Sequence, residues 1–235
     1  MLVRREMQRR VQVVARDPEA RYMWIRLQLS EIRVLYIALC YFSPRGSRYA
    51  TLGGEDDMGN GQGEEHTLAG DSPYSVLSED IVHYSTLGEV LLMGDFNART
   101  QNRQCEIYDM EDPEMMLAMT TEDTGTTRLS TDTGPDNTRY GHHLLELGAR
   151  HHLIIYNGMT SWPASGGLTC FPLGGGGSTI DYVLGSRETV HVVTSFTIPQ
   201  CPIGADHTYL SLSLTGSPCI LTTPSPTPLS TLRMT

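Results

Sequence analysis

The chain has no lysine, no paired cysteine motif and no long apolar run, and each absence argues against a class of protein. All 17 basic residues are arginine, a bias to which we attach no function. The five cysteines lack CxxC or Cys/His spacing, which argues against zinc and against a disulfide framework. No apolar run approaches the roughly 20 residues of a membrane span, and residues 1–5 turn basic too early for a signal peptide. We therefore expect an intracellular protein of the nucleus or cytoplasm, neither secreted nor bound to a membrane.

Negative charge is unevenly distributed along the chain. The formal net charge is −10, and residues 53–72 and 106–123 carry acidic residues without a single arginine. We expect both segments to be solvated loops. The first 33 residues are instead rich in arginine, so the total charge neither excludes nor supports DNA binding. From residue 215 onward serine, threonine and proline dominate, which is typical of a disordered tail and limits the folded domain to residues 1–214.

Hydrophobic periodicity predicts about eight strands with two or three helices between them. The almost continuous apolar run 33–41 fits a strand buried on both faces. An apolar stripe at i, i+3, i+7 and i+10 predicts an amphipathic helix over residues 73–84. Further strands are expected at 11–15, 23–29, 89–93, 153–156, 178–184, 189–196 and 209–214, with helices at 141–149 and near 113–119. This pattern favours an α/β or α+β sandwich over a Rossmann sheet.

A polar tetrapeptide, Gly94-Asp95-Phe96-Asn97, ends the apolar strand 89–93. Buried strands of α/β folds commonly carry functional polar side chains at their ends. Asp95 can orient or deprotonate an attacking water, and Asn97 offers both a donor and an acceptor for a phosphate oxygen. An Asx-turn or a helix cap explains the same pattern without any function, and the tetrapeptide alone does not decide between them.

A second group of polar residues lies near the end of the chain. Asp181 is a carboxylate in an apolar strand, where an unpaired charge is costly. His207 offers it a partner, because an Asp–His pair fixes the imidazole tautomer in many hydrolytic sites. Asp206 then remains free to bind a hard cation through oxygen. The alternative is that Asp206-His207 is an ordinary surface loop.

Taken in order, the motifs resemble the endonuclease/exonuclease/phosphatase superfamily, which includes DNase I-like and abasic-site nucleases. The resemblance is carried by GDFN at 94–97, by STIDYVL at 178–184 and by ADH at 205–207. A closer resemblance to the endonuclease domains of non-LTR retrotransposons rests on Arg128, Ser130, Asp132, Asn137, Gly141, Leu144-Leu145-Glu146-Leu147, Asn157-Gly158, Thr169-Cys170-Phe171 and the glycines before Ser178. Together these cover residues 2–214. The resemblance implies a DNase I-like α+β fold, a four-layer α/β/β/α sandwich.

The resemblance also implies catalytic roles, residue by residue. Asp95 is expected to activate or orient the attacking water, and Asn97 to position water and scissile phosphate. Asp181 is expected to pair with a catalytic His207. The implied reaction is hydrolysis of a phosphodiester bond in DNA by a monomeric enzyme that uses Mg²⁺, or Mn²⁺.

Substrate and metal ligands follow from the same resemblance. Tyr41, in Cys40-Tyr41-Phe42-Ser43-Pro44, resembles the family's phosphate-contacting tyrosine. Thr169 and Phe171 lie where relatives contact the DNA backbone and the sugar pocket, and Asp206 resembles a metal-site carboxylate. Each of these roles is an expectation from the resemblance alone.

The sequence departs from the family at its start. In the family, a strand with an asparagine and a strand ending in a metal-binding glutamate precede the segment that residues 1–5 resemble. We therefore expect a sandwich without its first strands and without the main metal ligand. Two functions stay open: an endonuclease domain derived from a retroelement that also encodes a reverse transcriptase, and a catalytically inactive remnant that serves as a structural or binding module.

Overall fold

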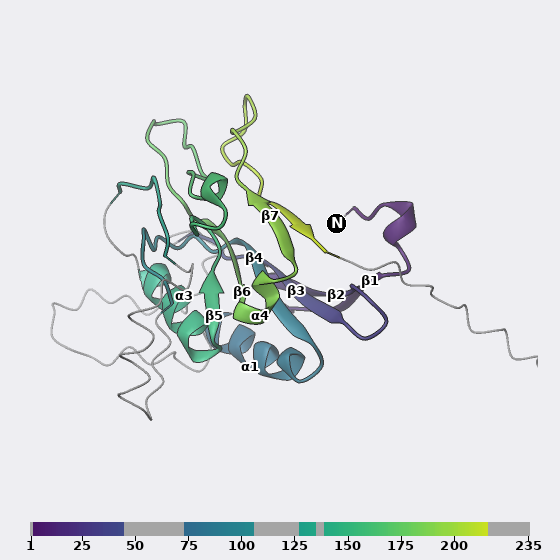
Figure 1. Cartoon of the computed structure of the whole chain (residues 1–235). Helices are drawn as coiled ribbons and strands as arrows, with labels where there is room; N and C mark the ends of the chain where they lie inside the picture. The colour runs from purple at the N-terminus through teal and green to yellow at the C-terminus, as the bar shows by residue number, and fades with distance from the viewer. Residues whose placement is uncertain (1, 45–72, 106–126, 135–138, 216–235) are drawn as a thin grey trace, which may run out of the picture.

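The computed structural model describes residues 2–44, 73–105, 127–134 and 139–215 (Figure 1). The predicted acidic loops 53–72 and 106–123 and the predicted helix near 113–119 lie outside these residues. So does the predicted tail, apart from residue 215. Those predictions therefore have no counterpart in the described structure.

A mixed six-stranded sheet forms the centre of the fold. Its strands lie in the order β1-β2-β3-β4-β6-β5, and of the neighbouring pairs only β3 and β4 are parallel. The strands are β1 Val11–Arg16, β2 Tyr22–Gln28, β3 Val34–Tyr41, β4 Glu89–Asp95, β5 Leu153–Ile155 and β6 Asp181–Ser186. β3 is the apolar run predicted at 33–41, and the side chains of its first seven residues are buried or half-buried because each face of the sheet packs against another layer.

Two helices cover one face of this sheet. They are α1 Pro73–Ser85, which connects β3 to β4, and α3 Arg139–Arg150. The predicted stripe of α1 is buried, with Leu77 and Ile81 at 0% and 1% exposure. Its last member, Tyr84, packs against Trp24 with tilted rings whose centroids are 4.4 Å apart. Burying side chains of this size contributes about 1.5–3 kcal/mol each, which makes this stripe the main attachment of α1.

A two-stranded sheet packs on the opposite face. β7 Val193–Thr197 pairs antiparallel with β8 Ser211–Leu214, and Phe196 joins Leu91 in a second core cluster. The predicted strand 189–196 is wrong at its start, where Arg187–Val190 form the helix α4. The helix begins there because the Ser186 side chain accepts a hydrogen bond from Thr189 N and caps the first turn. Two 3₁₀ helices, η1 Arg5–Met7 and η2 Pro163–Ser165, complete the described elements.

The described residues thus form an α+β fold, as predicted, in layers of helices, six-stranded sheet and two-stranded sheet. The three-residue η2 packs against β7 of the two-stranded sheet. Within the described segments, no helix combines the length and the apolar character needed to cross a membrane.

Candidate active site

Three neighbouring strands place a tyrosine and two aspartates side by side at one end of the six-stranded sheet. Tyr41, the last residue of β3, is the register partner of Asp95, the last residue of β4. Asp95 is in turn the partner of Asp181, the first residue of β6. Directly opposed residues of antiparallel strands have Cβ atoms about 4.5–5.5 Å apart. The strand register therefore brings the two carboxylates together.

The motif at the end of β4 requires two unusual backbone conformations. Gly94 has a φ of 135°, and a Cβ there would lie 2.0 Å from the Cys40 carbonyl oxygen, so only glycine fits beside β3. Asn97 has a φ of 47°, which asparagine adopts more readily than most residues. Asn97 N donates to Asp95 Oδ1 at 2.8 Å, and Asn97 Nδ2 donates to Phe42 O at 2.6 Å. The Asx-turn considered as an alternative is thus present, and it orients the two side chains that the site needs.

Asp181 and His207 form a hydrogen-bonded pair. His207 Nδ1 lies 3.0 Å from Asp181 Oδ2, and Asp181 is buried while His207 is half-buried. Backbone pairing holds the histidine in place. The backbone of Cys170 forms isolated β-bridges with Ser178 and with His207, and Phe171 N donates to Asp206 O at 2.6 Å. The segment 169–171 therefore joins the start of β6 to the loop that carries the histidine.

These side chains surround an open cavity of about 430 Å³. Its lining residues are Tyr41, Pro44, Asp95, Asn97, Asp206 and His207. Five of the eight residues predicted as the site thus line one cavity, and Asp181 contacts it through His207. Tyr41 is 56% exposed, so its phenol is accessible to a bound molecule.

Two carboxylates set the electrostatics of the cavity. Burial raises the pKa of the Asp95 carboxyl to about 6, and the nearby charge of Asp181 adds to the rise. The backbone hydrogen bond from Asn97 and the proximity of His207 act in the opposite direction without cancelling it. The ionised form of Asp95 is therefore costly, and a bound cation would lower that cost.

The donor set fits a divalent cation. One ligand atom from each of Asp95, Asp181 and His207 lies within 4.8 Å of the others, the one such group among the described residues. Asp206, predicted as the metal ligand, is exposed on the cavity wall and is not part of this group. Carboxylate oxygens suit Mg²⁺ and Mn²⁺, and an imidazole is also accepted by Mn²⁺ and softer ions. The carboxylate whose pKa is raised is thus a member of the group that could hold the ion.

The two predicted DNA contacts, Thr169 and Phe171, lie elsewhere. Thr169 has no exposed surface, and its Oγ1 accepts hydrogen bonds from the amides of Ile180 at 3.0 Å and Asp181 at 3.1 Å. A contact between the Thr169 side chain and DNA is therefore not available, because its hydroxyl holds the start of β6. Phe171 is half-buried and is not among the residues that line the cavity.

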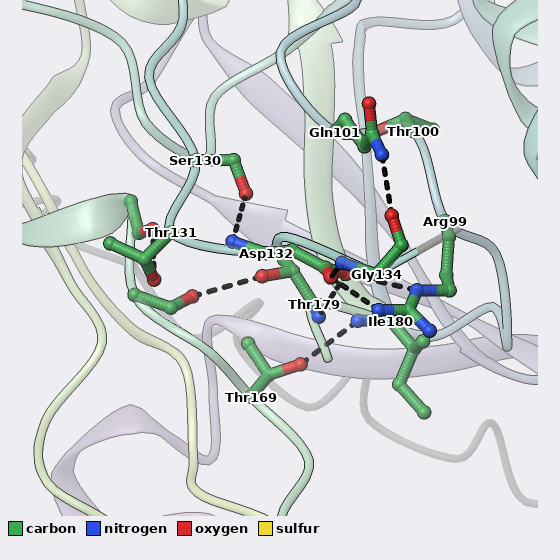
Figure 2. A network of polar contacts seen from close by, with 12 residues as sticks. Arg99, Thr100, Gln101, Ser130, Thr131, Asp132, Gly134, Thr169, Thr179 and Ile180 are labelled. Atoms are coloured by element: carbon green, nitrogen blue, oxygen red, sulfur yellow. Dashed lines mark hydrogen bonds and ion pairs between the residues drawn. The ribbon is translucent and has the colours of Figure 1, made fainter. Parts of the chain in front are cut away.

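Arg99 and Asp132 form an ion pair close to the site that sequence reasoning missed (Figure 2). The sequence indicates Asp132 only as part of a family-like motif and indicates no role for Arg99. The two residues are 33 positions apart. Because local periodicity reports neighbours within a few positions, no signal in the sequence pairs them.

Comparison with known proteins gives likenesses in structure alone. No family model and no curated protein matches the chain. The AP endonuclease LMAP from Leishmania major is 14% identical with a TM-score of 0.53, over 86% of this chain and 56% of that one. The endonuclease domain of TRAS1, a telomere-specific non-LTR retrotransposon, is 13% identical with a TM-score of 0.48, over 87% and 68%. The 3′ phosphatase NExo from Neisseria, bound to a product DNA hairpin, is 16% identical with a TM-score of 0.44, over 87% and 70%.

Proposed function

We propose that this chain, which has the DNase I-like fold of the endonuclease/exonuclease/phosphatase superfamily, is a metal-dependent phosphodiesterase that cleaves DNA. The observation that supports this most is the convergence of Asp95, Asn97 and His207 on one cavity, with Asp181 behind the histidine. A water-activating carboxylate, an amide and an oriented imidazole are the groups that phosphodiester hydrolysis requires.

Each residue has a distinct task in the proposed reaction. Asp181 accepts the Nδ1 proton of His207, which leaves Nε2 as the atom that exchanges a proton or donates to a phosphate oxygen. Asp95, with its raised pKa of about 6, is suited to take a proton from the attacking water near neutral pH. Asn97 is held by Phe42 O and orients that water or the phosphate. The exposed phenol of Tyr41 donates to the phosphate from the neighbouring strand.

The carboxylate oxygens of Asp95 and Asp181, which lie with His207 in one group of potential ligands, would hold the divalent ion, and His207 keeps Nε2 for the phosphate. When bound, Mg²⁺ or Mn²⁺ supplies charge that stabilises the phosphorane-like transition state. Asp206 lies at the rim of the same cavity and completes the acidic wall on the side of His207.

Nicking of supercoiled plasmid DNA by the purified chain tests this proposal. We expect nicking in Mg²⁺ or Mn²⁺, none in EDTA, and a loss of at least about 100-fold in Asp95→Asn and in His207→Ala. Glu146→Gln, which removes a half-buried carboxylate that pairs with Arg150 on α3, is the control and should nick as wild type does. If the wild-type chain nicks no DNA in either ion while remaining folded, the proposal fails and the alternative of an inactive binding or structural module takes its place.

We also propose that the domain derives from a retroelement endonuclease. The support is the block from Arg128 to Leu147 together with Thr169-Cys170-Phe171, the residues that carry the closer resemblance.

Assaying matched DNA and RNA hairpins in parallel tests whether DNA is the substrate. Preferential cleavage of RNA would contradict DNA as the substrate.

A further inference from the structure

The ion pair Arg99–Asp132 lies where two strands of the site separate. β4 and β6 stay paired up to Asp95 and Asp181, and Phe96 N still donates to Ile180 O at 3.0 Å. Beyond this point Asp132 contacts both segments, through Arg99 on one and Thr179 on the other (Figure 2). Arg99 is two residues from Asn97, and Thr179, which also contacts Asp132, is two residues from Asp181.

Both carboxylate oxygens of Asp132 accept hydrogen bonds from these two segments and from its own loop. Its Oδ2 accepts from Thr179 N at 3.0 Å and from Arg99 Nε at 3.1 Å. Its Oδ1 accepts from Gly134 N at 2.9 Å and from Arg99 Nη2. The carboxylate is 1% exposed. Burial opposes its charge, but the bonds from Arg99, Thr179 and Gly134 outweigh burial and lower its pKa.

Side chains accept hydrogen bonds from the backbone amides of the segment that leads into Asp181. Three consecutive amides donate to side-chain oxygens: Thr179 N to Asp132, and Ile180 N and Asp181 N to Thr169 Oγ1. The position of Asp181 is thus determined by Asp132 and Thr169 in addition to its register with β4. An isolated buried ion pair rarely improves stability over an apolar contact, so its location between two site segments calls for another explanation.

We infer that Arg99 and Asp132 are positioning residues, which hold the segment bearing Asn97 at a fixed distance from the segment bearing Asp181, the hydrogen-bond partner of His207. The inference rests on the proposed function for its catalytic meaning. The bidentate geometry matters because two parallel bonds fix angle as well as distance. A lysine in place of Arg99 keeps the charge but loses this geometry.

Gly134 provides a way to disturb the pair without altering either charge. A Cβ at this position would lie 1.6 Å from Arg99 Nη2, so Gly134→Ala must displace the guanidinium. Asp132→Asn removes the negative charge of the pair, and Arg99→Lys removes the two-nitrogen geometry of the guanidinium. Asp80→Asn is a matched control, because Asp80 also accepts a hydrogen bond, from Trp24 Nε1 at 2.9 Å, but on the helical face of the sheet.

The test uses two readouts that need no catalysis, with the melting temperature measured for every variant. The first is the ¹⁵N signals of the His207 imidazole at fixed pH in EDTA, and the second is the Mn²⁺ dissociation constant by calorimetry. In Asp132→Asn, Arg99→Lys and Gly134→Ala we expect shifted His207 signals and Mn²⁺ affinity reduced about 10- to 100-fold, the range for residues that orient metal ligands. Asp80→Asn should leave both unchanged.

The outcomes separate this inference from the proposed function. Wild-type His207 signals in both Asp132→Asn and Gly134→Ala would overturn the positioning role, whatever the metal or nicking data show. If the variants show shifted His207 signals but the wild-type chain nicks no DNA, the positioning role is supported and the proposed nuclease activity is refuted. Equal effects in Asp80→Asn would show that the changes follow from lost stability alone, and would also overturn the inference.

Discussion

Replacing Asp95 with asparagine should make the metal-free protein more stable near neutral pH while abolishing its proposed activity. Asp95 stands opposite Asp181 across β4 and β6, and like charges at directly opposed positions are destabilising. Asparagine keeps the shape and the acceptor for Asn97 N, but it carries no charge. The substitution therefore removes a charge whose burial, and to a smaller extent whose repulsion by Asp181, raises the pKa of Asp95, and it leaves the local turn intact.

The size of the effect follows from the pKa of Asp95. The ordinary value is 3.8, and in the folded protein it is about 6. A carboxyl whose folded pKa is raised contributes stability that is complete below the unfolded value and is lost as pH rises through the folded value. A difference of about two units corresponds to about 3 kcal/mol. The stability gained by Asp95→Asn should thus be close to zero at about pH 4 and reach about 2–3 kcal/mol above pH 7.

Thermal unfolding in EDTA between pH 4 and 8 measures this difference. For a chain of this size, 2–3 kcal/mol corresponds to a rise in melting temperature of about 4–12 °C near neutral pH. Glu146→Gln controls for the loss of one negative charge. A difference between Asp95→Asn and wild type that does not change with pH would refute the raised pKa, and with it the reason for assigning Asp95 as the base.

Three further predictions concern the stability of the fold. Gly94→Ala should lower stability by about 1–3 kcal/mol in thermal melts, because its Cβ would meet Cys40 O; a neutral result would contradict the conformation of β4. Thr169→Val should cost about 2–4 kcal/mol in denaturant unfolding by leaving two amides without an acceptor, and Thr169→Ser should not. Asp17 pairs with Arg21 and has a lowered pKa, so its contribution should vanish as pH falls below 3.8; an acid titration in which Asp17→Asn matches wild type at neutral pH would refute it.

Much of the fold follows from sequence because its elements are defined by local periodicity. The stripe containing Leu77 and Ile81 identifies α1 and the face it buries. The apolar runs that end at Tyr41 and before Asp95 identify β3 and β4, which place two site residues at strand ends. The pairing of Asp181 with His207 follows from chemistry and not from periodicity, because a buried carboxylate needs a partner.

The rest depended on contacts between distant residues. β6 begins at Asp181 and not at the predicted residue 178, because side chains of Asp132 and Thr169 take the preceding amides away from the strand ladder. Thr169 looked like a surface group for DNA, but a threonine hydroxyl serves equally well as a buried acceptor, and the sequence does not distinguish these uses. The α4 helix was missed because a four-residue helix is too short to show periodicity.

The row Tyr41, Asp95, Asp181 has a consequence for how such a domain evolves. Side chains alternate between the two faces of a strand, so a shift of one residue in the pairing of β4 with β6 would turn one carboxylate toward the opposite layer. Insertions or deletions inside either strand would therefore eliminate the site in a single step, although an apolar core could still form. Changes in length should accumulate in the connections between the strands, while drift within β4 and β6 should proceed by substitution alone.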